Sequence, residues 1–179
     1  MGLCPWDDGV SPLPIVPAQM YACDLSISSQ NGVVGQEVTT ELAQRTKMVQ
    51  YGALPILIDD GQLRVLLITS RETRRWIIPK GWPVKKLSPS AVAAREAFEE
   101  AGLEGRVADR PLAVFSYVKR LKSGRCVTCQ VETYLFEVDR ELDDWPEKYQ
   151  RERRWVSPDE AARLVSDAGL GDVLRELVR

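Results

Sequence analysis

The chain has 179 residues, which is enough for one domain with a hydrophobic core and short for two. Its 24 Lys and Arg residues nearly balance its 26 Asp and Glu residues, and the net charge of −2 provides no general basic field that would favour nucleic acid. The absence of histidine excludes histidine general bases, Ser-His and Cys-His nucleophile pairs and histidine metal sites, so acid–base chemistry falls to carboxylates, lysine, tyrosine or metal-bound water.

Residues 1–47 differ in composition from the rest of the chain. Prolines interrupt the opening, and the stretch SISSQNGVVGQ offers few side chains that could pack in a core. This composition predicts a disordered extension, followed by a domain over residues 48–179. No apolar run approaches the ~20 residues that cross a bilayer, and the opening lacks the basic-then-apolar order of a signal peptide. We therefore expect no membrane role.

The first part of the domain reads as a hairpin followed by a short strand. The run GALPILI, residues 52–58, predicts a buried strand, and Asp59-Asp60-Gly61 predicts a hairpin turn. The run LRVLLITS, residues 63–70, predicts the partner strand. The run TRRWIIPKG then predicts a short strand that leads into Gly81.

A short helix is predicted between Ser88 and Gly102. Ser88 is a good N-cap, Pro89 suits the first helical position, and Gly102 supplies the left-handed residue that commonly ends a helix. At about 100° per residue, one side of this helix is apolar and is expected to pack on a sheet. That predicted apolar side consists of Ala91, Ala94, Phe98 and Ala101.

The other side of the predicted helix carries Glu96, Glu99 and Glu100 within about one quadrant of its surface. Like charges at i, i+3 and i+4 repel one another and destabilise a bare helix. One interpretation is an acidic face that is simply solvated. The other is a cation site, since oxygen ligands at this density suit Mg²⁺ or Mn²⁺.

The second part of the domain reads as three strands and two helices. Two strands are predicted over residues 106–120 and 125–139, joined across 121–124, and a last short strand over 153–156. Ser157-Pro158-Asp159-Glu160 predicts a capping box that opens a helix to about Asp167, and a shorter helix is predicted over 172–178.

Cys126 and Cys129 form a CxxC, which could indicate a zinc ribbon or a redox pair. Residues three apart on a strand point to opposite faces, however, and no second CxxC completes a zinc site. We interpret the four cysteines as reduced, which predicts a cytoplasmic location.

The helix and the glycine before it together resemble the Nudix box. The matching positions are Gly81, Arg95, Glu96, Glu99, Glu100, Gly102 and Leu103, whereas Leu87 stands where the box expects its first Glu. The resemblance implies an α/β fold, the Nudix-type α/β/α sandwich with a mixed β-sheet. It also implies a Mg²⁺ site, with Mn²⁺ as the alternative, whose ligands are Glu96, Glu99, Glu100 and the Gly81 carbonyl.

The resemblance further implies that Arg95 orients a glutamate by ion pairing. In this family the general base comes either from the box or from a loop glutamate, and Glu152 and Glu132 are the candidates outside the box. The alternative for either residue is a surface ion pair. Leu87 leaves the identity of the base open.

A wider resemblance covers residues 52–178. The segment SRETRRWIIPKGW, the box and the segment ELDDWPEKYQRERRWVSPDEA are similar to diphosphoinositol polyphosphate phosphohydrolases. Lys80 replaces a glycine that is usual in the animal enzymes, and Lys85 and Lys86 replace acidic loop residues. Both changes make the mouth of the expected site more basic.

A highly anionic substrate needs cations around the site, with arginine forks and lysine point charges as phosphate ligands. Trp82 and Tyr117 could provide a shelf for a nucleobase, whereas Trp76 is expected in the core. About half of the basic residues are expected to serve solubility only, because hairpin tips are usually charged. The candidate substrate-binding residues are Arg71, Arg75, Lys80, Lys85, Lys86, Lys119 and Arg125.

Three functions follow from the resemblance and the charges. The first is Mg²⁺-dependent hydrolysis of phosphoanhydrides in diphosphoinositol polyphosphates or dinucleoside polyphosphates, by a monomer or dimer that binds no nucleic acid. The second is hydrolysis of nucleoside diphosphate derivatives of the ADP-ribose type, which the many cations disfavour. The third is a catalytically weak polyphosphate-binding module, for which Leu87 is the best support.

Overall fold

The computed structural model describes residues 48–120 and 126–178. The predicted disordered extension over 1–47, the predicted connection over 121–124 and the candidate site residue Arg125 lie outside the described residues. The elements run in the order β1 (Met48–Asp59), β2 (Gln62–Thr69), β3 (Trp76–Ile77), β4 (Lys80–Gly81), α1 (Pro89–Ala101), β5 (Leu103–Val107), β6 (Ala113–Arg120), β7 (Cys126–Glu141), β8 (Arg153–Val156), α2 (Pro158–Leu164) and α3 (Ala168–Glu176).

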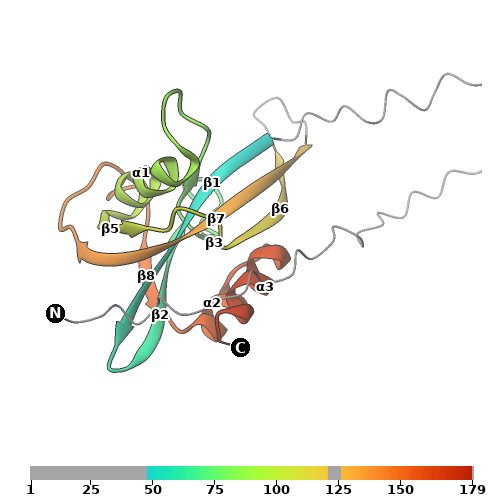
Figure 1. The fold of residues 1–179 in the computed structure, drawn as a ribbon. Helices are drawn as coiled ribbons and strands as arrows, with labels where there is room; N and C mark the ends of the chain where they lie inside the picture. Colours follow the sequence, from blue (N-terminus) through green and yellow to red (C-terminus); the bar gives the residue numbers. More distant parts are fainter. Residues whose placement is uncertain (1–47, 121–125, 179) are drawn as a thin grey trace, which may run out of the picture. The chain divides into compact units, whose positions relative to one another are not determined.

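All eight strands of the described part belong to one mixed sheet built around β1 and β7 (Figure 1). β1 runs parallel to β7 over the register from Met48 opposite Cys129 to Ile56 opposite Glu137. On its other edge β1 pairs antiparallel with β2 and with β4. β7 is long enough to pair antiparallel with β6 along its first half and with β5 along its second half. This arrangement confirms the predicted α/β fold with a mixed sheet.

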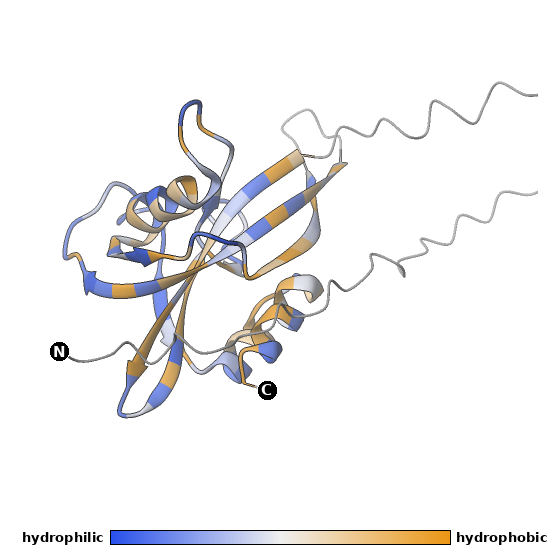
Figure 2. Ribbon diagram, in the orientation of Figure 1, coloured by the Kyte–Doolittle hydropathy of each residue, from blue (hydrophilic) through white to orange (hydrophobic). Residues whose placement is uncertain are grey.

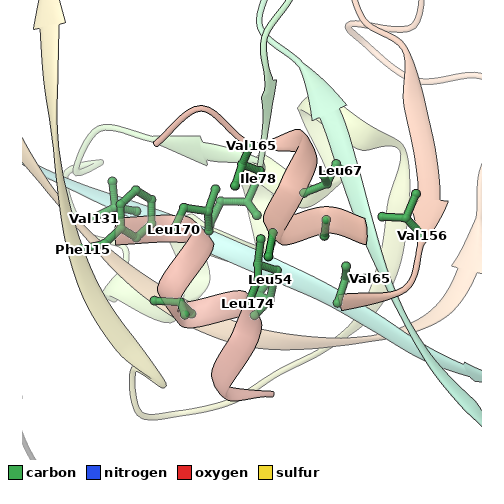
Figure 3. Packing of buried hydrophobic residues seen from close by; sticks show 13 residues of the cluster. Leu54, Val65, Leu67, Ile78, Phe115, Val131, Val156, Val165, Leu170 and Leu174 are labelled. Atoms are coloured by element: carbon green, nitrogen blue, oxygen red, sulfur yellow. The ribbon is translucent and has the colours of Figure 1, made fainter. Parts of the chain in front are cut away.

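Helices cover both faces of the sheet. Successive strand residues point to opposite faces, so Ala53 of β1 packs with α1, whereas Leu54 packs with α2 and α3. Figure 3 shows the second of these clusters, with Leu170 and Leu174 of α3 lying against Leu54 and its neighbours. Each face of β1 is therefore sealed by its own apolar cluster, as expected for strands buried on both sides.

Hydropathy follows the same division (Figure 2). Apolar residues gather along the middle of the sheet and on the inner sides of the helices, whereas the tip of the loop between β4 and α1 is hydrophilic. No helix among residues 48–120 and 126–178 is long and apolar enough to cross a membrane.

The caps predicted for α1 are present. The Ser88 hydroxyl accepts a hydrogen bond from the Ala91 N–H at 3.2 Å, and Pro89 is the first helical residue. Gly102 adopts the left-handed conformation with φ of 65°, and its N–H donates to the Phe98 carbonyl at 2.9 Å. An L side chain is rarely tolerated at that φ, so Gly102 fixes where the helix ends.

The predicted packing face of α1 is confirmed for Ala101, which is fully buried, and wrong for Phe98. Phe98 is 40% exposed, and the buried residues are Val92, Ala93, Ala97 and Ala101, together with Glu100 at 8% exposure. The helix is rotated so that Glu100 lies in the middle of the inward side, between small alanine side chains. Phe98 then lies opposite, toward solvent. The prediction assumed that carboxylates face away from the protein, whereas here one of them faces inward.

Two predicted strands are divided by proline. The predicted strand over 106–120 is β5 and β6 with Pro111 in the break, and the predicted strand over 73–81 is β3 and β4 with Pro79 between them. Proline lacks the N–H that a ladder requires. The carbonyl of Pro79 still accepts from the Ala53 N–H at 2.9 Å, so β4 stays attached to β1.

The remaining local predictions hold with shifted boundaries. Asp60 and Gly61 have φ values of 47° and 74°, as the predicted hairpin turn requires. The first of the last two helices ends at Leu164, before the predicted Asp167, and α3 begins at Ala168, before the predicted residue 172. Cys129 is buried with a free thiol, as predicted, while the side chain of Cys126 lies outside the described part.

Candidate active site

The site begins where α1 passes β4. Gly81 of β4 lies so close to Glu96 that an added Cβ would stand 2.7 Å from the Glu96 Oε2 atom, closer than any real Cβ contact. A side chain at position 81 would therefore displace the Glu96 carboxylate. The structure thus brings together two residues that the sequence assigned to one metal site.

Glu96 is held in an environment that opposes its negative charge. Burial, followed by the charges of Glu100 and Glu99, raises the pKa of Glu96 to about 7, and Arg95 only partly opposes this. A nearby cation is the usual means of stabilising a carboxylate under such conditions. The electrostatics at Glu96 therefore favour binding of a positive ion.

Glu99 lies at the outer side of the same turn. The Arg95 Nε donates to the Glu99 Oε1 at 2.8 Å, and both side chains are partly exposed. Arg95 therefore contacts a box glutamate by ion pairing, as the sequence predicted. A pair of this exposure is worth about 0.5 kcal/mol, so Glu99 can leave Arg95 at small cost.

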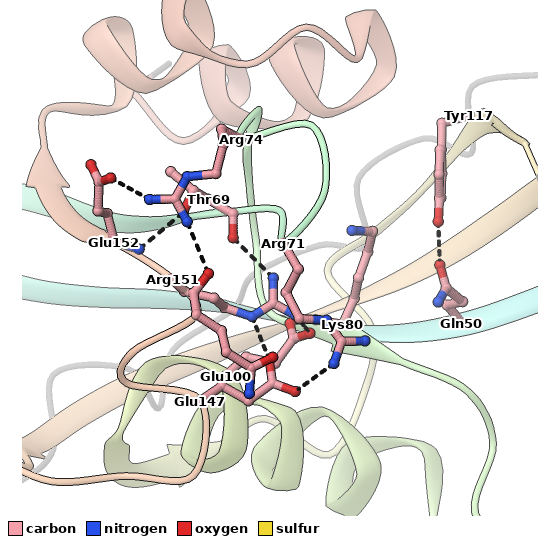
Figure 4. A network of polar contacts seen from close by, with 11 residues as sticks. Gln50, Thr69, Arg71, Arg74, Lys80, Glu100, Tyr117, Glu147, Arg151 and Glu152 are labelled. Carbon is pink, nitrogen blue, oxygen red and sulfur yellow. Dashed lines mark hydrogen bonds and ion pairs between the residues drawn. The ribbon is translucent and has the colours of Figure 1, made fainter.

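Glu100 occupies the inner side of the turn, and both of its oxygens are engaged (Figure 4). Its Oε2 accepts from the Lys80 backbone N–H at 3.0 Å, and its Oε1 forms an ion pair with Arg151. Burial raises the pKa of Glu100, whereas Arg151 and the Lys80 N–H lower it. Glu100 is thus the most buried of the three box glutamates.

Glu147 is a fourth carboxylate at the site, and the sequence analysis missed it. It lies in the loop between β7 and β8, where its N–H donates to the Glu99 carbonyl at 3.1 Å. Arg151 pairs with both Glu147 and Glu100, which places Glu147 beside the cluster. Its Oε2 accepts from the Arg151 Nε at 2.6 Å and its Oε1 from Arg71 at 3.3 Å. The only sequence signal was the i, i+4 spacing of Glu147 and Arg151.

The two predicted general bases are engaged with other partners. Glu152 is exposed and forms an ion pair with Arg74, which was the alternative considered for it. Glu132 of β7 accepts a hydrogen bond from the Tyr134 hydroxyl at 3.0 Å. Neither forms a hydrogen bond or ion pair with a box carboxylate among the described residues. Glu147 bonds the Glu99 carbonyl and shares Arg151 with Glu100, so it is the better placed candidate.

The segment that follows β7 closes the end of α1. The Leu142 N–H donates to the Gly102 carbonyl at 2.8 Å, and Arg153 donates to the Ala101 carbonyl at 2.9 Å. Trp145 lies over Gly102, and the Arg153 guanidinium lies 4.2 Å from the centre of the Trp145 ring. These contacts satisfy carbonyls that the end of a helix leaves unpaired, so the segment anchors the helix that carries the carboxylates.

Lys80 is the partly buried member of the predicted substrate-binding set. Its Nζ lies 5.4 Å from the centre of the Tyr117 ring, and Tyr117 donates its hydroxyl to Gln50 at 2.5 Å. Burial lowers the pKa of Lys80 to about 8, although the charges of Glu100 and Asp167 oppose this. Its ammonium has no ion pair within 4.0 Å among the described residues.

The other predicted cations are spread around the site. Arg71 contacts Glu147, and Lys119 of β6 lies 4.7 Å from the centre of the Trp82 ring. Arg75 is exposed and donates to the Thr73 hydroxyl at 3.1 Å. Lys85 and Lys86 are exposed in the loop that leads to α1. Figure 4 shows Arg71 beside Glu147, and Lys80 bonded through its backbone N–H to Glu100.

The donor set fits a hard divalent ion in its chemistry. It offers carboxylates and the Gly81 carbonyl, with no thiolate or imidazole. Among the described residues, however, no three His, Cys, Asp or Glu side chains already converge on one point. Glu99 is turned to Arg95 and Glu100 to Arg151, so ion binding requires side-chain rotation, for which Glu99 is the least constrained.

Comparison with known proteins agrees with this geometry. The NUDIX domain model matches residues 48–177. Nudix hydrolase 12, mitochondrial, of Arabidopsis thaliana is 34% identical over 124 residues, covering 66% of this chain and 60% of that protein. Diphosphoinositol polyphosphate phosphohydrolase 3-beta of Homo sapiens is 31% identical over 103 residues, covering 56% of this chain and 58% of that protein.

A solved structure supports the fold. The Ap4A hydrolase of C. elegans superposes with a TM-score of 0.54 at 18% identity, covering 74% of this chain and 96% of that one. The chain spans about 60% of the length of the curated relatives that it matches. The family model covers most of the chain, and β4, α1 and the carboxylates all lie within the match. The chain therefore belongs to the NUDIX domain family.

Proposed function

We propose that the chain is a Mg²⁺-dependent hydrolase of phosphoanhydrides that acts on diphosphoinositol polyphosphates, dinucleoside polyphosphates or both, with Mn²⁺ as an alternative ion. The observation that carries the proposal is the position of Glu96, crowded by other carboxylates and fitted against Gly81. A bound divalent ion would neutralise charge on the phosphate oxygens and lower the pKa of a bound water. Relatives named as hydrolases support the same chemistry.

In this proposal the carboxylates of α1 hold the ion, together with the Gly81 carbonyl. Glu96 and Glu99 are the accessible ligands, and Glu100 lies deeper, bonded to Arg151. Glu147 is the candidate for the additional ligand or general base, in place of Glu152 and Glu132. Arg95 orients Glu99 until the ion binds.

Leu87 weakens this proposal less than the sequence suggests. Its side chain is 42% exposed in the loop before α1, so a glutamate at this position would begin in solvent. The hydrogen bonds and ion pairs of Glu99 and Glu100 with Arg95, Arg151 and the Lys80 N–H are made without a carboxylate at this position.

The substrate is proposed from the distribution of cations. Lys80 lies in β4 with an ammonium that no described carboxylate pairs, and Arg71 lies beside Glu147. Lys119 over Trp82 adds a charge at the rim of the sheet. Groups of this kind suit a chain of several phosphates better than a single diphosphate. The names of the relatives include diphosphoinositol polyphosphate phosphohydrolase, which supports this substrate class.

The cytoplasmic location expected from the cysteines stays a prediction.

The test is hydrolysis by the full chain with Mg²⁺, comparing a diphosphoinositol polyphosphate, diadenosine hexaphosphate and ADP-ribose by chromatography of the products. The first substrate releases phosphate, whereas the other two are split into nucleotides or into AMP and ribose phosphate. We expect turnover of the first two, lost on chelation and reduced about 100-fold or more in Glu99→Gln. Glu72→Gln, which removes an exposed carboxylate of the β2–β3 loop, should leave the rate unchanged. Preference for ADP-ribose would contradict the substrate class. Substrate binding without turnover would favour the binding-module alternative.

A further inference from the structure

Arg151 joins three segments that are distant in the sequence. Its Nε donates to Glu147 at 2.6 Å, its Nη1 donates to the Thr69 carbonyl at 2.9 Å, and its Nη2 forms the ion pair with Glu100. The loop, the end of β2 and the helix α1 therefore meet at one guanidinium (Figure 4). All three nitrogens have a partner in a different segment.

The burial of Arg151 separates it from the cations proposed to bind substrate. Its side chain is 5% exposed, whereas the side chain of Arg71 is 57% exposed. A guanidinium with each nitrogen engaged and so little exposure is poorly placed to meet a phosphate. Its partners show instead that it acts on carboxylates of the protein.

The contacts of Arg151 fix the position of Glu147. One oxygen of Glu147 accepts from Arg151 and the other from Arg71, while the Glu147 N–H is held by the Glu99 carbonyl. A carboxylate oxygen has lone pairs to spare, so it can accept from an arginine and still serve another partner. Carboxylates that bind metal are commonly hydrogen-bonded in this way by residues behind them.

We propose that Arg151 is a positioning residue, which holds Glu147 of the loop and Glu100 of α1 in one anionic site so that the loop supplies a carboxylate to the ion bound by the box. This inference rests on the proposed function, because it concerns the same metal site. It depends on the planar fork of arginine and not on charge alone, since a lysine ammonium cannot reach three acceptors with the same fixed geometry.

The test measures the affinity of the full chain for Mn²⁺ alone, by electron paramagnetic resonance of the free ion, with urea unfolding to check the fold. We expect Arg151→Lys to raise the Kd about 10-fold or more. The matched control is Arg154→Lys in β8, because Arg154 is exposed and pairs with Glu160 of α2 and with none of the site carboxylates. Arg154→Lys should change the Kd less than about twofold.

A double-mutant cycle with Glu147→Gln distinguishes positioning from a general loss of structure. If Arg151 acts through Glu147, then Arg151→Lys adds less than about twofold to the Kd of Glu147→Gln. Effects that multiply would overturn the inference, as would an Arg151→Lys protein with the Kd of the wild type.

A second variant tests the inference should Arg151→Lys fail to fold. Glu147→Asp shortens the loop side chain by one methylene, while Arg151 and Glu100 stay paired. We expect the same loss of Mn²⁺ affinity. Wild-type affinity in Glu147→Asp would then refute the inference. A wild-type chain that neither binds Mn²⁺ nor hydrolyses a polyphosphate would refute the proposed function itself, whereas normal wild-type binding with unchanged variants refutes only the role of Arg151.

Discussion

The raised pKa of Glu96 has a consequence for stability that can be measured without substrate. The unfolded chain ionises Glu96 near pH 4.5, whereas the folded, metal-free protein does so at about 7. The folded state therefore binds the extra proton between these values, and stability is lost as the pH rises from 4.5 through 7. The full difference corresponds to about 3 kcal/mol, and solvent screening of the partly exposed side chain leaves about 1–2 kcal/mol.

Glu96→Gln removes this penalty, because an amide stays neutral at every pH. In EDTA at pH 8 the variant should be about 1–2 kcal/mol more stable than the wild type, and at pH 4.5 the two should differ little. Urea unfolding at both pH values measures the difference. Saturating Mg²⁺ should reverse the order at pH 8, because the ion stabilises only the protein that keeps the carboxylate.

The matched control is Glu72→Gln, which alters an exposed carboxylate in the β2–β3 loop. It should show no such pH dependence and no such response to Mg²⁺. The reasoning is refuted if Glu96→Gln destabilises the metal-free protein at pH 8, or if its effect is the same at pH 4.5 and 8.

Three further predictions concern the helix and its surroundings. Gly81→Ala should lower Mg²⁺-dependent turnover about 10-fold or more, because the new Cβ displaces the Glu96 carboxylate; steady-state kinetics and a normal unfolding curve would check this. Val92→Ala should cost roughly 2 kcal/mol of unfolding free energy and Phe98→Ala less than about 1, because Val92 is fully buried and Phe98 is 40% exposed; urea unfolding compares them. The KM for a polyphosphate should rise above pH 8 as the Lys80 ammonium loses its proton, and a Lys80→Met protein should lack this pH dependence.

Local signals in the sequence were sufficient to predict where α1 begins and ends and where the chain turns between β1 and β2. Ser88, Pro89 and Gly102 act through bonds within a few residues, so their effect does not depend on the rest of the fold. The same holds for Asp60 and Gly61, whose φ values determine the hairpin. The list of box residues likewise follows from spacing alone.

The rotation of α1 could not be predicted in the same way. Helical periodicity places Glu100 and Phe98 on opposite sides but does not say which side faces the protein. Hydrophobicity favours burying Phe98, yet Arg151 and the Lys80 N–H together satisfy a buried Glu100. Arg151 is 51 residues from Glu100, and such a pair is formed by tertiary structure. Glu147 was missed for the same reason.

The segment after β7 carries part of the resemblance to diphosphoinositol polyphosphate phosphohydrolases. Its position in the structure bears on whether that part of the resemblance concerns the substrate. Trp145 and Arg153 cover the end of α1, and the same segment delivers Glu147 and Arg151 to the carboxylates. In this chain the matching segment therefore anchors the box helix. The proposed choice of substrate rests instead on the cations around the site, of which Lys80 is partly buried beside Glu100. Exchanging those cations, while leaving the segment intact, is the way to alter substrate preference without weakening the metal site.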